Sequence, residues 1–233
     1  MKRESKLHEE LKRLYADQMG GETEVSVAGF SADVIKDRQV VEIQLGKLLA
    51  LKPKIRALLG QGYSVKVVLP LQVALTAPVR KTFTGKTFMR TTRRRTSFLN
   101  VFDELVYWTD VFPAERLSLE VLLLHEGRDW VAKTVTVWRG RFPRRRLLNK
   151  LRRDTKVVEI MDKRVFKDGC DLLNLLPDNL PDLFTNRDLA KLAGISYSLA
   201  ARVTYTLKAL QALEKRGRRD RSTLYSASSN KAY

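Results

Sequence analysis

Hydrophobic positions in the first third of the chain change their spacing in a regular order. Leu7, Leu11 and Leu14 recur at helical spacing and predict an amphipathic helix over about residues 4–17. Alternating apolar residues then predict two strands that fold at Gly29 and a third strand, followed by a helix from Pro53 and a nearly all-apolar strand. These later elements are expected at residues 22–35, 40–45, 53–59 and 63–71. The order α-β-β-β-α-β predicts an α/β fold.

The middle of the chain is less regular. Residues 76–98 are basic and rich in threonine with few apolar anchors, so we expect a long loop or flexible arm there. Leucines at 147, 148 and 151 indicate a helix inside the basic segment 139–156. A short helix and three further strands are predicted at residues 101–106, 117–125, 134–138 and 157–161.

Two prolines, Pro177 and Pro181, punctuate the chain after these elements. We therefore predict a first domain over residues 1–165, a linker over 166–177 and a small second domain over 178–233.

The second domain carries the signals of two helices in tandem. Thr185 is a good N-cap with Asp188 three residues later, Gly194 suits a left-handed turn, and Ser196 caps the next helix. The segment resembles a helix-turn-helix unit, and residues 213–227 look like the basic hairpin of a winged helix. This resemblance implies that the second helix enters a DNA major groove. A small protein-binding domain is the alternative.

The net charge of +18 is concentrated in blocks. Residues 76–99 hold seven basic and no acidic side chains, residues 139–156 sum to +8, and residues 185–233 sum to +7. Like charges within such a block repel one another unless a polyanion neutralises them. We therefore favour nucleic acid as the partner over an anionic membrane surface or an acidic protein. The predicted DNA contacts are Arg80, Lys81, Lys86, Arg93, Arg94, Arg95, Arg144, Arg145, Arg146, Tyr197, Ser198, Arg202, Tyr205, Lys215, Arg216, Arg218, Arg219 and Arg221. The arginine triplets at 93–95 and 144–146 are expected to contact phosphates, and a solvated charge run is the alternative.

Cys170 is the single cysteine, which excludes an internal disulfide and a cysteine-based metal cluster. The charged start of the chain lacks a following apolar signal segment, and no apolar run approaches membrane-spanning length. We expect a cytoplasmic protein that makes no membrane contact.

Three polar residues on the predicted strands indicate a chemical site. Glu42 and Gln44 are two residues apart and project from the same face, and Asp33 comes near Glu42 if the two strands pair. Converging carboxylates bind a hard cation such as Mg²⁺, which polarises a phosphate and activates water. Glu10 lies beside the apolar face of the first helix and could reach the same cluster. Ordinary exposed polar positions on a half-buried sheet remain the alternative.

Residues 5–75 resemble the PD-(D/E)XK nuclease superfamily, the restriction-endonuclease-like fold built on a mixed sheet. The resemblance rests on Ala32-Asp33-Val34, on Val41-Glu42-Ile43-Gln44 and on the element order. It implies that Asp33, Glu42 and the main-chain carbonyl of Ile43 are metal ligands, and that Glu10 matches a helix carboxylate of some members.

The chain departs from the family at Gln44, where a lysine is most frequent. Lys47 or Lys54 is therefore expected to supply the missing positive charge.

These inferences together predict a Mg²⁺- or Mn²⁺-dependent DNA endonuclease, a hydrolase held on duplex or branched DNA by its basic segments and winged helix. Symmetric double-strand cleavage would require a homodimer. A non-catalytic DNA-binding regulator on a degenerate nuclease fold is the alternative, and RNA as substrate stays open.

Overall fold

A computed structural model describes residues 5–80, 87–139 and 142–228, with backbone alone at residues 80, 87, 129–139 and 142–154. The elements of the first part follow the predicted order. They are α1 (Lys6–Met19), β1 (Glu22–Val27), β2 (Phe30–Lys36), β3 (Gln39–Ile43), a 3-10 turn (Leu48–Leu51), α2 (Lys52–Gly60) and β4 (Ser64–Arg80). Ser5 caps α1, and Pro53 lies in the first turn of α2, where it loses no hydrogen bond.

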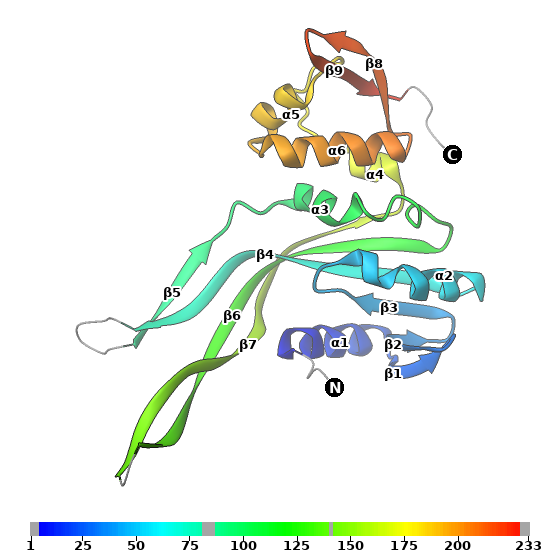
Figure 1. Cartoon of the computed structure of the whole chain (residues 1–233). Coiled ribbons are helices and arrows are strands. Elements are labelled where there is room, and N and C mark those ends of the chain that lie inside the picture. Colours follow the sequence, from blue (N-terminus) through cyan, green and yellow to red (C-terminus); the bar gives the residue numbers. More distant parts are fainter. Residues whose placement is uncertain (1–4, 81–86, 140–141, 229–233) are drawn as a thin grey trace.

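The middle of the chain forms two long hairpins, which contain the strands predicted at 117–125, 134–138 and 157–161 and replace the predicted helix near Leu147. Their strands are β4 with β5 (Thr87–Arg93) and β6 (Leu117–Arg139) with β7 (Phe142–Phe166). Both hairpins extend beyond the body of the protein to the same side (Figure 1). A 3-10 turn (Phe98–Val101) and helix α3 (Phe102–Leu105) lie between them in sequence, where a short helix is predicted.

The loop prediction is wrong for residues 76–80 and 87–93, which are strand, because the threonines there favour extended backbone. It holds for residues 94–97, and residues 81–86 lie outside the described part of the chain. The helix prediction near Leu147 is wrong because Leu147 and Leu148 pair with Thr134 and Lys133 across the second hairpin. Local leucine spacing carries no information about that partner strand.

A mixed sheet forms the centre of the molecule, with strand order β1-β2-β3-β4-β6-β7 and β5 added to the outer part of β4. The neighbours β3, β4 and β6 run parallel, whereas β1, β2 and β3 form an antiparallel meander. Helix α1 packs Leu11 on one face of the sheet, and α2 packs Ile55 and Leu58 on the other. The protein is therefore a mixed α/β protein, as predicted.

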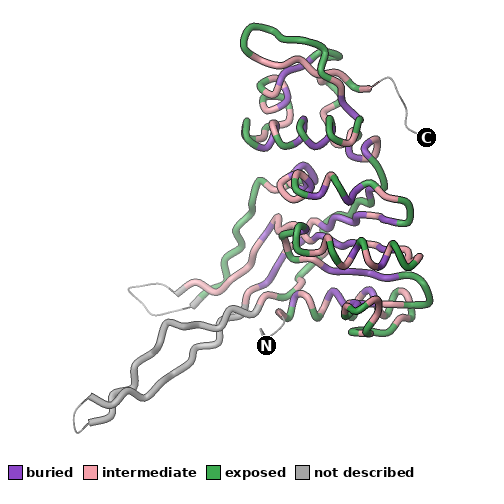
Figure 2. The backbone as a smooth tube through the Cα atoms, turned by 45° about the vertical axis from the view of Figure 1, so that its right-hand side comes forward, coloured by how far each residue is buried: buried purple, intermediate pink, exposed green. Residues whose placement is uncertain are grey.

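The C-terminal part consists of α4 (Gly169–Leu173), α5 (Asn186–Ala193), α6 (Tyr197–Ala209) and the hairpin β8 (Leu213–Arg219) with β9 (Ser222–Ala227). The predicted caps are present: Thr185 and Asp188 form a capping box, and Gly194 has φ of 63°. The segment predicted as a linker contains α4 with a fully buried Leu172. Buried side chains of α6 belong to the same hydrophobic core as those of α3. Figure 2 marks the buried residues of the C-terminal helices and of the sheet in purple.

Candidate active site

The candidate site lies near the C-terminal end of β3, where the backbone pairing of β2 with β3 stops. Backbone pairing between these strands runs from Lys36 and Gln39 to Val34 and Val41. Beyond that point a side chain replaces the backbone partner: Oδ2 of Asp33 accepts a hydrogen bond from the backbone N–H of Ile43 at 2.8 Å. Asp33 is thus fixed between the two strands.

Glu42 is the second carboxylate of the site, and its side chain is only 2% exposed. Its Oε1 lies 3.4 Å from the backbone nitrogen of Asp33, and its Oε2 accepts a hydrogen bond from Nζ of Lys54. The same Lys54 ammonium donates to the carbonyl oxygen of Ser31 at 2.5 Å. Lys54 belongs to the first turn of α2, so the packing of α2 on the sheet brings it to Glu42.

The pKa values of the two carboxylates are shifted in opposite directions. Burial and the negative charge of Asp33 raise the pKa of Glu42 to about 7, although Lys54 opposes the shift. Burial also acts to raise the pKa of Asp33, but hydrogen bonds from His8 and from the Ile43 N–H hold it below its usual range. Glu42 therefore holds a proton more readily than Asp33, and both carboxylates depend on the single positive charge of Lys54.

His8 of α1 is the site residue that sequence reasoning missed. Its Nε2 lies 2.8 Å from the carbonyl oxygen of Ile43 and 3.3 Å from Oδ2 of Asp33. A histidine one position after Leu7 gives no signal by itself, because only the docking of α1 on the sheet brings its ring over the end of β3.

Glu10 takes a different place from the one predicted. Its Oε2 accepts a hydrogen bond from the backbone N–H of Val157 in β7, at 2.6 Å. The residue of α1 that contacts Asp33 is therefore His8, whereas Glu10 provides a hydrogen-bond acceptor for a backbone N–H of β7.

Gln44 and Lys47 lie on the loop after β3. The Gln44 amide donates to the carbonyl oxygen of Gly46 and reaches that of Lys47 at 3.4 Å, so it stabilises its own loop. Lys47 is exposed and has φ of 59°. Lys47 and Lys54 were the two candidates to replace the family's lysine at position 44. Of these, Lys54 is the one that contacts a site carboxylate, that of Glu42.

The ligands available at this edge fit a hard cation such as Mg²⁺ or Mn²⁺. Asp33, Glu42 and the Ile43 carbonyl offer oxygen atoms only, which is the donor type that Mg²⁺ selects. Within the described residues, no group of three or more His, Cys, Asp and Glu side chains is arranged around a single metal position. The fit therefore rests on two carboxylates and a backbone carbonyl.

The basic hairpin next to the site starts from the same edge of the sheet. Strand β3 ends at Ile43 opposite Val68, whereas β4 and β6 continue past that point into the hairpins. Arg93, Arg94 and Arg95 are exposed. The side chains of Arg80, Lys81, Lys86, Arg144, Arg145 and Arg146 lie outside the described ones.

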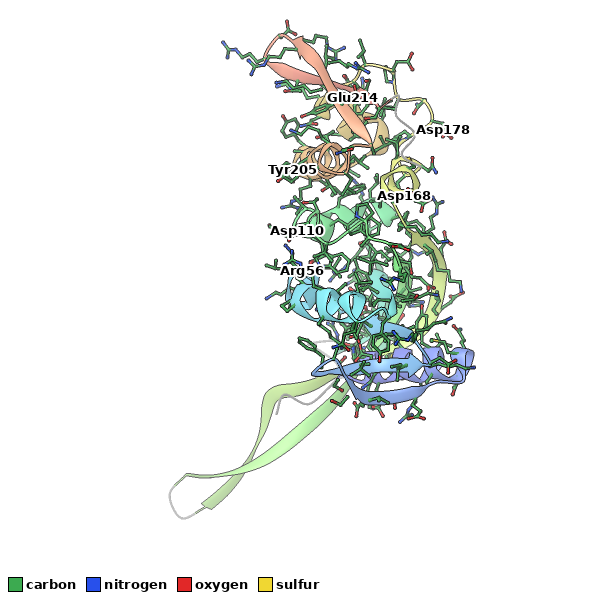
Figure 3. All side chains as sticks on the ribbon, turned by 90° about the vertical axis from the view of Figure 1, so that its right-hand side faces the viewer. Arg56, Asp110, Asp168, Asp178, Tyr205 and Glu214 are labelled. Atoms are coloured by element: carbon green, nitrogen blue, oxygen red, sulfur yellow. The ribbon has the colours of Figure 1, made fainter. Side chains whose placement is uncertain are left out.

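Residues of α6 and of the β8–β9 hairpin have mixed roles. Tyr197, Ser198 and Tyr205 are exposed, and Tyr205 lies on the same edge of the molecule as Asp110 and Arg56 (Figure 3). Arg202, predicted as a DNA contact, pairs with Asp103 of α3 at 2.5 Å. In the hairpin, Arg219 pairs with Asp188, and Arg216 pairs with Glu214. The exposed hairpin positions that have no ion pair among those found in the described part are Lys215, Arg218 and Arg221.

The fold and the site define a mixed α/β protein with a carboxylate–lysine cluster at one sheet edge. The chain belongs to the family described as Domain of unknown function (DUF8091), whose model matches residues 5–167, from the cap of α1 to the end of β7. An uncharacterized protein of Treponema pallidum (strain Nichols) is 27% identical over 190 residues, or 81% of this chain and 72% of that protein. No solved structure matches the chain. No helix in the described ranges is long and apolar enough to cross a membrane.

Proposed function

We propose that this protein is a metal-dependent DNA endonuclease with a restriction-endonuclease-like core, and that residues 178–233 act as a winged helix. The observation that carries the proposal is the cluster of Asp33, Glu42 and Lys54 at the point where β2 and β3 separate. A buried pair of carboxylates beside a lysine is costly for the fold, so its presence favours a chemical role.

Hydrolysis requires that water adds to phosphorus and that the bond from phosphorus to one sugar oxygen breaks. Asp33, Glu42 and the Ile43 carbonyl would hold Mg²⁺ or Mn²⁺, which polarises the phosphate and lowers the pKa of bound water. Lys54 would neutralise the negative charge that develops on the phosphate oxygens. His8 would orient Asp33 and the Ile43 carbonyl through the contacts described above.

The arrangement of positive charge supports DNA as the substrate. Strand β3 ends beside the carboxylates at Ile43, and β4 and β6 continue past this point into the two hairpins. Residues 76–99 hold seven basic and no acidic side chains. A duplex that lies along the hairpins would pass the site, with affinity supplied by phosphate contacts. RNA remains a candidate that the same basic hairpins would serve.

The test is cleavage of supercoiled plasmid and branched DNA with Mg²⁺, with Mn²⁺ and with EDTA. The variants Asp33→Asn and Glu42→Gln keep the shape of each side chain and remove its charge. Glu10→Gln is the matched control, because Glu10 contacts the Val157 N–H and not Asp33. We expect metal-dependent cutting by the wild-type protein and by Glu10→Gln, and none by the two site variants.

A non-catalytic DNA-binding regulator is the second candidate. It is favoured by Gln44, which occupies the usual lysine position and hydrogen-bonds within its own loop. Tight DNA binding without cutting under any metal would support the regulator and refute the nuclease.

A further inference from the structure

The parallel strands β3, β4 and β6 begin at the edge of the sheet opposite the candidate active site. Their pairing starts at Gln39, Ser64 and Leu117, whereas the candidate site lies at the other end of β3. At a rise of about 3.3 Å per residue, the two ends of this five-residue strand are about 13 Å apart. In Figure 1 the starting edge lies on the right, away from the two hairpins. A ligand at this edge would therefore not contact Asp33 or Glu42.

A cavity of about 770 Å³ lies at this edge, between the last turns of α1 and the starts of the three strands. Its apolar lining includes Tyr15, Val41 and Leu117, each of which is no more than 4% exposed. The exposed side chains of Gln18 and Gln39 add amide groups to the lining. Cavities of about 300–1,000 Å³ hold small organic molecules. The cavity is therefore large enough for a ligand of nucleotide size.

Basic side chains outnumber acidic ones in the lining of this cavity. Lys66, Arg116 and Lys167 are basic, and Glu115 is acidic. Nζ of Lys66 lies 3.0 Å from Oε2 of Glu120, a carboxylate that is only 3% exposed, so this lysine is already paired. In the described part of the chain, neither Arg116 nor Lys167 forms an ion pair with a carboxylate. These two cations are therefore available to an anionic ligand.

A second arginine adds positive charge at the same edge. A Cβ on Gly62 would lie 2.9 Å from Nη1 of Arg38 and 3.4 Å from Nη1 of Arg116, so both guanidinium groups approach the same backbone position. The backbone carbonyls of these arginines accept hydrogen bonds from the N–H groups of Ser64 and Val65, which places one arginine on each side of β4. Two like charges that converge repel each other, and an anion between or beside them relieves the repulsion.

We propose that this cavity binds a nucleoside phosphate, with its phosphate at Arg116 and Lys167 and its base in the apolar part beside Tyr15. Guanidinium groups match phosphate in charge and in hydrogen-bond geometry. The base requires apolar surface with a few polar groups, which the amides of Gln18 and Gln39 supply. Inorganic phosphate would leave most of the cavity empty, and an uncharged nucleoside would leave the cations unpaired. This site is separate from the proposed nuclease and depends on neither DNA binding nor cleavage.

The experiment is isothermal titration calorimetry of the full-length protein in EDTA with AMP, ATP, adenosine and inorganic phosphate. Arg116→Asn removes one guanidinium group, and asparagine tolerates the left-handed backbone of this position, where φ is 62°. Lys167→Gln removes the second cation. Arg93→Gln is the matched control, because Arg93 is an exposed arginine of β5 outside the cavity lining. Circular dichroism with thermal unfolding confirms that each variant is folded.

We expect AMP and ATP to bind at least about tenfold more tightly than adenosine or inorganic phosphate. Arg116→Asn and Lys167→Gln should each weaken AMP binding by about tenfold or more, the usual effect of losing a charge-assisted hydrogen bond. Glu115→Gln should strengthen AMP binding by about threefold, because it removes the acidic side chain of the lining. Arg93→Gln should bind AMP within about twofold of the wild-type protein.

Three results would overturn the inference. Absence of AMP and ATP binding would remove the site altogether. Equal losses in Arg93→Gln and in the two cavity variants would mean that nucleotides attach to the basic surface in general. Inorganic phosphate that binds as tightly as AMP would mean that the base makes no contact. Cleavage of DNA, whether present or absent, bears on the proposed function alone.

Discussion

At the scale of single residues, Lys54 is the side chain on which the proposed chemistry depends most sharply. It donates to Glu42 and is only 13% exposed, whereas Lys47 is exposed on the loop. Lys54→Met removes the positive charge and keeps the length of the side chain. We expect a loss of about 10²–10³ in the cleavage rate, the usual effect of removing one group that stabilises developing charge.

Lys47→Met is the matched control for Lys54 and should cleave within about twofold of the wild-type rate. Single-turnover rates on saturating plasmid separate chemistry from binding in both variants. Equal rates for the wild-type protein and Lys54→Met would show that Lys54 only stabilises the fold.

Gly21 is a second residue whose role is set by one contact. A Cβ at this position would lie 2.7 Å from the carbonyl oxygen of Ile35, which is backbone of β2 and cannot move aside. Gly21→Ala should therefore lower the free energy of unfolding by about 1–3 kcal/mol. Gly60→Ala, where no atom lies within 4 Å of the new Cβ, should change it by no more than about 1 kcal/mol. Urea unfolding of both variants tests the difference, and equal stabilities would contradict the steric argument.

The sequence predicted the site only in part, and the reason is physical. Asp33 and Glu42 were predictable because they lie on adjacent strands near a hairpin, so their proximity follows from local chain geometry. Glu10 was predicted to reach the site and His8 was not, because the rotation of α1 on the sheet decides which of them faces Asp33. Lys54 was one of two lysines that the sequence left open.

At the scale of elements, the short hairpin, the caps and the first two helices were predictable from local signals. Parts of β6 and β7 were predicted as strands at 117–125, 134–138 and 157–161, but β5 and the length of the two hairpins were not, because a threonine-rich basic strand and a loop have similar composition. Their hydrogen bonds come from partner strands, and no pattern within one strand reports on its partner.

The N-terminus of α5 offers a test at this scale. Asp188 accepts hydrogen bonds from Thr185 N and Oγ1, each at 2.9 Å, and pairs with Arg219. The hydrogen bond from the Thr185 N–H, together with these other contacts, holds the pKa of Asp188 below its usual range. A lowered folded pKa stabilises the protein above the unfolded pKa, and this stabilisation is lost as the pH falls through the folded value.

Asp188→Asn should therefore destabilise the protein by about 0.5–1.5 kcal/mol near neutral pH and by progressively less as the pH falls below about 4. Asp220→Asn is the charge-matched control: Asp220 has φ of 56° in the β8–β9 turn, a conformation that Asn also adopts. Urea midpoints across pH measure both. A pH-independent effect of Asp188→Asn would mean that charge plays no part in the cap.

At the scale of the whole molecule, the question is whether the C-terminal part is a separate domain. Pro177 and Pro181 predict a linker, and the family match ends at residue 167. The core nevertheless continues across this boundary: Phe102 and Leu105 of α3 belong to the same buried cluster as Leu207 of α6. The ion pair of Arg202 with Asp103 joins the same two helices at the surface.

A shared core predicts one cooperative unfolding transition, because neither part can lose its packing without exposing apolar surface of the other. Leu207→Ala removes a fully buried side chain of α6 and should cost about 2–5 kcal/mol. Calorimetry of the full chain should show a single transition, with calorimetric and van't Hoff enthalpies equal, that shifts as a whole in the variant. Independent domains would give two transitions, of which Leu207→Ala moves only the C-terminal one. One transition would mean that the C-terminal helices unfold together with the sheet that carries Asp33 and Glu42. Under the proposed function, DNA bound by α6 would then lie at a fixed position relative to these two carboxylates.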